Sequence, residues 1–236
     1  MKLRILGNNG PYPASGGACS SNLLSSGSGN TNIIIDFGTG ALSALRSAIS
    51  YDKIDAVILS HLHFDHMSDM LPMQYALQFH PRSPLPVYAP ATPEKVHALL
   101  EAPCYALHEI KAVNIGEMEI SFLAVRHPVE TYAVRVACDG KIFVYTGDTN
   151  TLPALDAFAA DADLLLADAG LSTADWKESA PHLSAALCGE LAARCGAKSL
   201  LLSHLNSKYT ADAHVQEAKS AFKNVRFTET GAEYII

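Results

Sequence analysis

The sequence has few of the features that mark secreted or membrane-spanning proteins. Its five cysteines are odd in number and widely spaced, and none forms a Cys-x-x-Cys pair. A disulfide framework or a cysteine-based zinc knuckle is therefore not expected. No stretch approaches the roughly 18 consecutive apolar residues of a membrane span, and the N-terminus lacks the apolar core of a signal peptide. We expect a cytoplasmic protein that does not enter membranes.

Positive charge is also scarce. The 17 Lys and Arg residues are outnumbered by 24 Asp and Glu residues, and the net charge is −7. Proteins that bind nucleic acid through a broad cationic face usually show the opposite balance. Charged residues make up 17% and hydrophobic residues 49% of the 236 positions, a globular composition that excludes a disordered or fibrous chain. Histidine, in contrast, is plentiful, with ten residues against one tryptophan.

Short apolar or β-branched segments alternate with helical patterns along the whole chain. Asp139-Gly140 between two such segments is a strong signal for a hairpin turn. We therefore expect a single α/β domain over residues 1–236. The predicted strands are 3–6, 32–36, 55–60, 85–89, 118–125, 132–137, 141–146, 163–167, 199–203 and 225–228, with one more within 15–30, and the predicted helices are 41–49, 66–79, 93–101, 151–159, 183–194 and 211–222.

One short segment concentrates metal-binding residue types. His61 and His63 follow an apolar strand and are two positions apart, so on an extended strand end they point the same way and can share one metal ion. Asp65 and His66 start the next helix and can serve a second ion. A single histidine at a strand end is more often a surface residue, but four such residues together favour a metal centre. Because the donors are nitrogen and oxygen without cysteine, a catalytic site is favoured over a structural zinc site.

This segment resembles the signature of the metallo-β-lactamase superfamily of binuclear metallohydrolases, which implies a four-layer αββα sandwich. The family's remaining ligands follow in order at the ends of predicted strands. For one of these remaining residues, Asp148, the alternative interpretation is that its side chain caps the N-terminus of a helix. By resemblance, the first metal is held by His61, His63 and His127, the second by Asp65, His66 and His204, and Asp148 bridges the two.

The resemblance also implies the chemistry. A hydroxide that bridges the two ions would be the nucleophile, because two cations lower the pKa of water and no side-chain base is needed. Mixed imidazole and carboxylate sites accept several metals, so we expect two divalent ions, with zinc first and manganese or iron as alternatives.

Three further motifs are similar to those of the ribonuclease Z-like phosphodiesterase branch. They are Tyr132-x-x-Arg135 after His127, the Pro-His-Leu-Ser-Ala segment 181–185, and Lys208-Tyr209 after the last ligand. The resemblance gives His182 the role of contacting a phosphate oxygen or protonating the leaving alkoxide. Asp168, where the branch prefers Glu, would orient it through a hydrogen bond. The alternative is that His182 is a solvent-exposed residue at a helix start. Asp65, His182 and Asp168 are thus the predicted catalytic residues, Asp65 being a ligand as well.

The sequence departs from the tRNA-maturing members of that branch, which carry a protruding basic arm between the second and third motifs. Residues 67–126 are filled by predicted helices and strands and contain few basic residues. Together with the net charge, this predicts a small or cyclic phosphodiester as substrate and no large RNA partner. Hydrolysis of a carboxylic ester, thioester or lactone is the alternative, and a non-catalytic metal-binding module is a third hypothesis. Relatives in this branch are often dimers, so the resemblance also allows a homodimer.

Four histidines have no partner at ligand spacing. His80, His97, His108 and His214 are therefore expected at surface or amphipathic positions.

Overall fold

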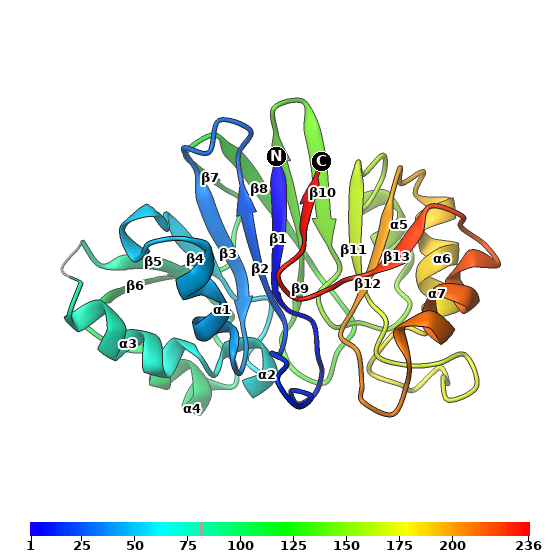
Figure 1. Cartoon of the computed structure of the whole chain (residues 1–236), viewed down its shortest axis with the longest axis horizontal. Helices are drawn as coiled ribbons and strands as arrows, with labels where there is room; N and C mark the ends of the chain where they lie inside the picture. Colours follow the sequence, from blue (N-terminus) through cyan, green and yellow to red (C-terminus); the bar gives the residue numbers. More distant parts are fainter. Residues whose placement is uncertain (81–82) are drawn as a thin grey trace.

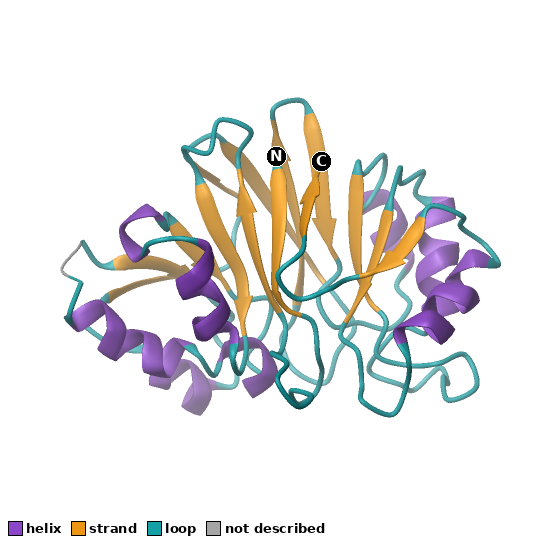
Figure 2. Cartoon of the chain, viewed as in Figure 1, coloured by secondary structure: helices purple, strands orange, loops and turns teal. Residues whose placement is uncertain are grey.

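A computed structural model describes residues 1–80 and 83–236. Within these residues the chain forms two mixed sheets that face each other, with helices outside both (Figures 1 and 2). The first sheet has the order β14 (Glu233–Ile235), β1 (Lys2–Gly7), β2 (Ser21–Ser25), β3 (Asn32–Phe37), β4 (Ala56–Ile58), β5 (Leu85–Tyr88) and β6 (Tyr105–His108). The second has the order β13 (Val225–Phe227), β12 (Leu200–Ser203), β11 (Leu164–Asp168), β10 (Lys141–Tyr145), β9 (Tyr132–Cys138), β8 (Met118–Ala124) and β7 (Val113–Ile115).

The helices form the two outer layers. In Figure 1, those of the N-terminal half flank the first sheet and those of the C-terminal half flank the second. The first group is α1 (Ala41–Ala48), α2 (Phe64–Met67), α3 (Met70–Gln78) and α4 (Glu94–His97), and the second is α5 (Pro153–Phe158), α6 (Ala185–Arg194) and α7 (Ala211–Lys219). Among the described residues, no helix combines the length and apolarity that crossing a bilayer requires.

Three buried clusters hold these layers together. In β3, Ile33 and Ile35 belong to the cluster between the sheets, whereas Ile34 belongs to the cluster under the N-terminal helices. Successive side chains of a strand point to opposite faces, so a strand covered on both sides is apolar throughout. A third cluster, which includes Leu165 and Leu191, lies under α5–α7. Three cores between four layers confirm the predicted αββα sandwich.

Two differences from the predicted elements have local causes. The helix expected over 66–79 is divided into α2 and α3, and Asp69 between them accepts a hydrogen bond from the backbone N–H of Leu42. The strands β6, β7 and β14 were not predicted. Each is three or four residues long and lies at a sheet edge, so its alternation of buried and exposed residues is too short to detect.

Candidate dimetal site

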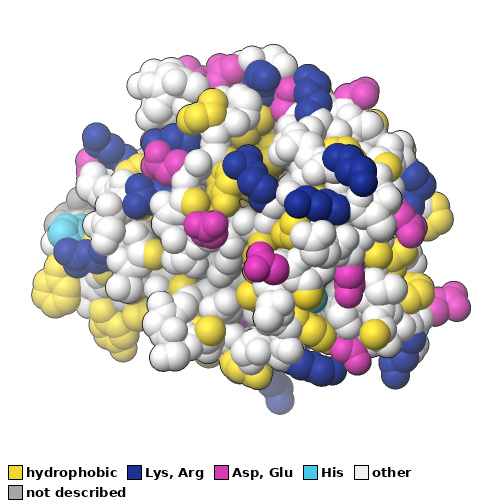
Figure 3. Space-filling model, turned by 45° about the vertical axis from the view of Figure 1, so that its right-hand side comes forward, with side chains coloured by type: hydrophobic (Ala, Val, Ile, Leu, Met, Phe, Trp, Pro, Cys, Tyr) yellow, Lys and Arg dark blue, Asp and Glu magenta, His cyan; other side chains and the backbone are white. Residues whose placement is uncertain are grey.

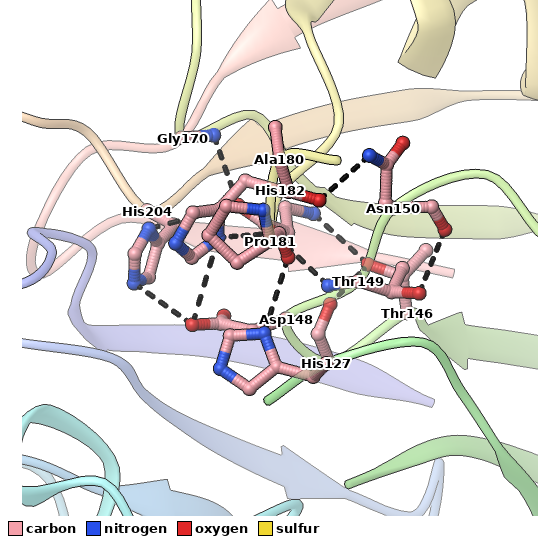
Figure 4. A network of polar contacts seen from close by, with 12 residues as sticks. His127, Thr146, Asp148, Thr149, Asn150, Gly170, Ala180, Pro181, His182 and His204 are labelled. Carbon is pink, nitrogen blue, oxygen red and sulfur yellow. Dashed lines mark hydrogen bonds and ion pairs between the residues drawn. The ribbon is translucent and has the colours of Figure 1, made fainter. Parts of the chain in front are cut away.

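The site lies where parallel strands of both sheets end. The first sheet supplies His61 after β4, which runs parallel to β3, and the second supplies Asp148, Asp168 and His204 at the ends of the parallel strands β10, β11 and β12. The carboxyl ends of parallel strands meet at one edge of a sheet, where binding sites commonly form. Figure 4 shows Asp148, His127, His182 and His204 converging from different loops at this edge.

The three histidines predicted for the first metal lie together. His63 Nδ1 is 3.1 Å from His61 Nε2 and 3.1 Å from His127 Nε2. His61 Nδ1 contacts Ser60 Oγ and His127 Nδ1 contacts the Pro181 carbonyl oxygen, so the ring nitrogens that face one another are free to bind a cation. Burial lowers the pKa of His61 well below its usual value, and it also lowers the pKa of His63 and of His127. Neutral imidazole is the form that binds metal ions.

The second predicted group is also assembled, with Asp148 between the two groups. Asp148 Oδ2 lies 3.3 Å from His66 Nε2, 3.2 Å from His204 Nε2 and 3.8 Å from His61 Nε2. Asp65 Oδ2 lies 3.2 Å from His204 Nε2. Burial opposes ionisation, but His204 and His66 hold the pKa of Asp148 well below its usual range. This carboxylate is therefore the one in position to serve both groups.

These residues fit a pair of divalent cations. Within the described chain, His66 Nε2 and Asp148 Oδ1 are buried and have no hydrogen-bond partner. Buried polar atoms are rarely left unsatisfied, and a metal ion is one ligand that satisfies a lone pair on nitrogen and oxygen together. The nitrogen and oxygen atoms of Asp65, His66, Asp148 and His204 lie within 4.8 Å of one another, as do those of His61, His63 and His127.

His182 sits beside the second group and is held by Asp168. Its Nδ1 donates a hydrogen bond of 2.8 Å to Asp168 Oδ2 and lies 3.8 Å from Asp148 Oδ2. Asp168 is itself fixed, because its oxygens accept hydrogen bonds from the backbone N–H groups of Thr149 and Gly170. Burial alone would lower the pKa of His182, but the neighbouring Asp168 carboxylate raises it above its usual value. The structure thus places His182 in contact with the site rather than free in solvent, with only 18% of its side chain exposed.

One buried residue of the site was not predicted. Asp36, at the end of β3, accepts hydrogen bonds from His66 Nδ1 (2.7 Å), Tyr145 Oη (2.9 Å) and both the backbone N–H and the hydroxyl of Ser60 (2.7 and 2.8 Å). It leaves Nε2 of His66 to face the ligand cluster. The signal in the sequence was an acidic residue directly after the apolar run 33–35.

Replacing Asp36 by asparagine is expected to weaken metal binding at the second group by about 10- to 100-fold, because a neutral amide holds the His66 ring less firmly. Competition with a chelator measures the change. Asp163→Asn is the matched control, since Asp163 is a largely buried, hydrogen-bonded carboxylate at the opposite end of β11. Unchanged metal affinity in a folded Asp36→Asn protein would contradict this role.

The loop that carries His182 is braced from two sides. Asn150 Nδ2 donates a hydrogen bond to the Ala180 carbonyl, and Asn150 Oδ1 accepts one from Trp176 Nε1 (2.7 and 3.0 Å; Figure 4 shows the Asn150–Ala180 contact). Asp175 in the same loop accepts hydrogen bonds from Lys208 Nζ and Tyr209 Oη (2.9 and 2.7 Å). The Lys-Tyr motif therefore contacts the His182 loop.

The two residues of the Tyr132-x-x-Arg135 motif do not contact the His182 loop in any hydrogen bond described for them. Arg135 donates hydrogen bonds to the carbonyl oxygens of Phe158 and Ala160 at the end of α5, and Tyr132 donates one to Glu130. The guanidinium of Arg135 is therefore bound to backbone carbonyl groups.

The glycine-rich turn at residues 7–10 packs directly on His204, the last candidate ligand. A Cβ on Gly10 would lie 2.1 Å from His204 Nε2, so only glycine allows this approach. The turn is tied to the ligand loop by hydrogen bonds from Leu205 N–H to the Asn8 carbonyl and from Gly10 N–H to the Leu205 carbonyl (2.8 and 3.2 Å).

Of the surface or amphipathic positions expected for His214, a surface position is wrong. His214 is fully buried on α7, with ring centroids 5.0 Å from Tyr209 and 6.1 Å from Phe227. It lies four residues before the buried Ala218, on the face of α7 that packs inward.

Comparison with known proteins identifies the family. A model described as a beta-lactamase superfamily domain matches residues 31–205, the span that contains all seven predicted ligands. The chain belongs to this family. A family relative from Bacillus subtilis, named "Probable metallo-hydrolase YhfI", is 32% identical over 231 residues, 94% of each chain. Its crystal structure has a TM-score of 0.93 at 31% identity and covers 99% of both chains. The protein is thus a metallo-hydrolase of the beta-lactamase superfamily, as the motifs predicted.

More distant structures share the fold of this beta-lactamase superfamily member. The short form of human tRNase Z has a TM-score of 0.82 at 18% identity and covers 100% of this chain and 99% of its own. A diphosphatase from the PhnP family has a TM-score of 0.76 at 19% identity, with coverages of 100% and 97%. At these identities the likeness concerns the fold.

Proposed function

We propose that the protein is a phosphodiesterase that cleaves a small or cyclic phosphodiester at a dimetal site. The observation that carries this proposal is the Asp168–His182 pair, 2.8 Å apart, beside the predicted bridging residue Asp148. The leaving oxygen of a phosphodiester gains negative charge as the bond breaks, so a positioned proton donor accelerates the step. Hydrolysis of a carboxylic ester or lactone also releases an alkoxide, so that alternative chemistry is separated from this one by the substrate assay below.

In this proposal the candidate ligands are divided between two metal ions. His61, His63 and His127 would hold one ion, and Asp65, His66 and His204 the other, with Asp148 shared. Zinc is the first expectation and manganese or iron are alternatives, since imidazole and carboxylate donors suit all three. Two such cations supply a water molecule of lowered pKa and neutralise the charge of the phosphoryl group.

His182 would act through its free ring nitrogen. Because Nδ1 is bound to Asp168, Nε2 is the atom that can carry a proton to the leaving oxygen. The Asp168 carboxylate favours the protonated ring and keeps its orientation, while the braces on residues 175–180 hold the loop in place. Asp168 is therefore proposed as a positioning residue and His182 as the proton donor.

A small substrate is supported by the surface and by the arrangement of residues 67–126. On the face drawn in Figure 3, basic and acidic side chains are intermingled. The described part of 67–126 is occupied largely by α3, β5, α4, β6, β7 and β8, which belong to the outer helix layer and the two sheets. Exclusion of large RNA and a cytoplasmic location remain predictions.

Turnover of bis(p-nitrophenyl) phosphate by the purified, metal-loaded protein tests the proposal, with lactones, thioesters and carboxylic esters assayed under the same metal loading. We expect hydrolysis of the phosphodiester to exceed that of every carbon ester in kcat/KM. Faster turnover of a lactone or thioester would favour the alternative chemistry. Absence of any turnover, with metal content well below two ions per chain, would favour a non-catalytic metal-binding module.

A further inference from the structure

A cavity near the candidate metal-binding residues has no part in the proposed mechanism. It is a cavity of about 450 Å³ at the carboxyl ends of β5 and β6. Its walls include His97, Leu107, His108, Glu109, Glu130 and Tyr132. His97 and His108 are two of the histidines that the sequence left without a task.

The cavity lies at the same edge of the first sheet as the candidate metal-binding residues. The strands β3, β4, β5 and β6 are parallel neighbours, and the ends of β3 and β4 supply Asp36 and His61. The ends of β5 and β6 open on the cavity. Its wall residue Tyr132 donates a backbone hydrogen bond of 2.9 Å to Ser60, the neighbour of His61. Glu130 follows His127 by three positions, so the cavity borders the loop that carries one of the first group of histidines.

The lining disfavours an anionic group. None of the described lining residues is Lys or Arg, whereas Glu109 and Glu130 both contribute carboxylates. Burial alone would raise the pKa of Glu130, but hydrogen bonds from Tyr132 and Thr92 lower it. Glu130 is therefore ionised at neutral pH. A second phosphate placed here would meet negative charge without a cation to balance it.

The walls also favour a flat ring. The ring of the wall residue His108 stacks on Tyr88 behind it, with centroids 4.9 Å apart and planes inclined by 23°, and Leu107 adds apolar surface. Planar groups stack on such surfaces, and carboxylates accept hydrogen bonds from N–H or O–H groups at the ring edge.

We propose that this cavity receives a flat, hydrogen-bond-donating ring of the substrate that carries no negative charge, while the single phosphate of the substrate lies at the candidate metal-binding residues. The site then selects singly charged phosphodiesters and discriminates against substrates with a second phosphate. This inference rests on the proposed phosphodiesterase function.

Two ring-bearing substrates test the inference: a nucleoside 2′,3′-cyclic phosphate and the same compound with an additional 5′-phosphate. We expect the wild-type protein to prefer the first in kcat/KM. Glu109→Lys, a charge reversal at an exposed wall residue, should narrow this preference by about tenfold. Glu101→Lys is the matched control, because it makes the same charge change at an exposed residue outside the cavity lining and should leave the preference unchanged.

The outcomes separate the two proposals. Methyl p-nitrophenyl phosphate, which lacks a second phosphate, reports phosphodiesterase activity by itself, and failure of the wild-type protein to hydrolyse it would overturn the proposed function. If it is hydrolysed but Glu109→Lys and Glu101→Lys show the same preference, the cavity does not receive the ring. Glu109→Gln, the milder change, should shift the preference in the same direction by a smaller factor and decides the matter if the lysine variant does not fold.

Discussion

Replacing Asp148 by alanine is expected to lower kcat/KM for phosphodiesters by about a thousandfold and to reduce the metal content from two ions per chain to one. Asp148 Oδ2 lies within 3.8 Å of ring nitrogens from both groups, so its loss removes the predicted shared ligand and leaves His66 and His204 without this anionic partner. Elemental analysis of the purified variant, combined with steady-state kinetics, measures both effects.

Asp156→Ala is the matched control for this substitution. Asp156 pairs with Arg194 on the surface through a contact of 2.8 Å and contributes to neither metal group. The control should retain two ions and wild-type activity, because exposed ion pairs contribute about 1 kcal/mol or less to stability. An Asp148→Ala protein that keeps both ions and its activity would show that this carboxylate does not bridge them.

Replacing His182 by alanine is expected to slow cleavage of an alkyl phosphodiester by about 100- to 10,000-fold, but to have a much smaller effect on bis(p-nitrophenyl) phosphate. An alkoxide needs a proton as it leaves, whereas p-nitrophenolate is stable without one. The metal content should stay at two ions, since His182 is predicted to be a proton donor and not a ligand. The comparison of kcat for the two substrates under one metal loading is the measurement.

Two variants sharpen the test of His182. Asp168→Asn should show the same dependence on the leaving group at a smaller magnitude, because it weakens the hydrogen bond that orients the ring. His80→Ala, at an exposed histidine, is the control and should behave as the wild-type protein. Equal losses on both substrates in His182→Ala would show that the residue shapes the site without transferring a proton.

Local spacing explains why the candidate ligands could be found before the structure was known. The segment 60–66 combines a strand end with a helix start, and its four donor residues fall close together whatever the rest of the chain does. The remaining candidate ligands were assigned by the family resemblance, and they follow apolar strands long enough to detect, such as β8, β10 and β12. The edge strands β6 and β7 escaped detection because their few residues are half covered and half exposed.

The supporting contacts could not be derived in the same way. Asp36 and His66 are 30 positions apart, as are Asn150 and Ala180, and nothing in the intervening sequence sets their distance. These pairs meet because β3 and β4 are neighbours and because the loop after β11 folds back over the end of β10. The burial of His214 has the same origin, since it depends on the packing of α7 against β13.

The sequence alone determined the alternating α/β elements and the donor cluster at 60–66, because these depend on short-range periodicity and spacing, and its resemblance to a known family supplied the order of the seven candidate ligands and the layered sandwich. The tertiary structure decided which atoms face one another. It placed Asp148 between the two histidine-rich groups, turned His182 toward Asp168 and left a carboxylate-lined cavity beside them. The physical reason is that hydrogen bonds and Coulomb interactions act over a few ångströms, and only the packing of the two sheets brings residues that are distant in sequence within that range.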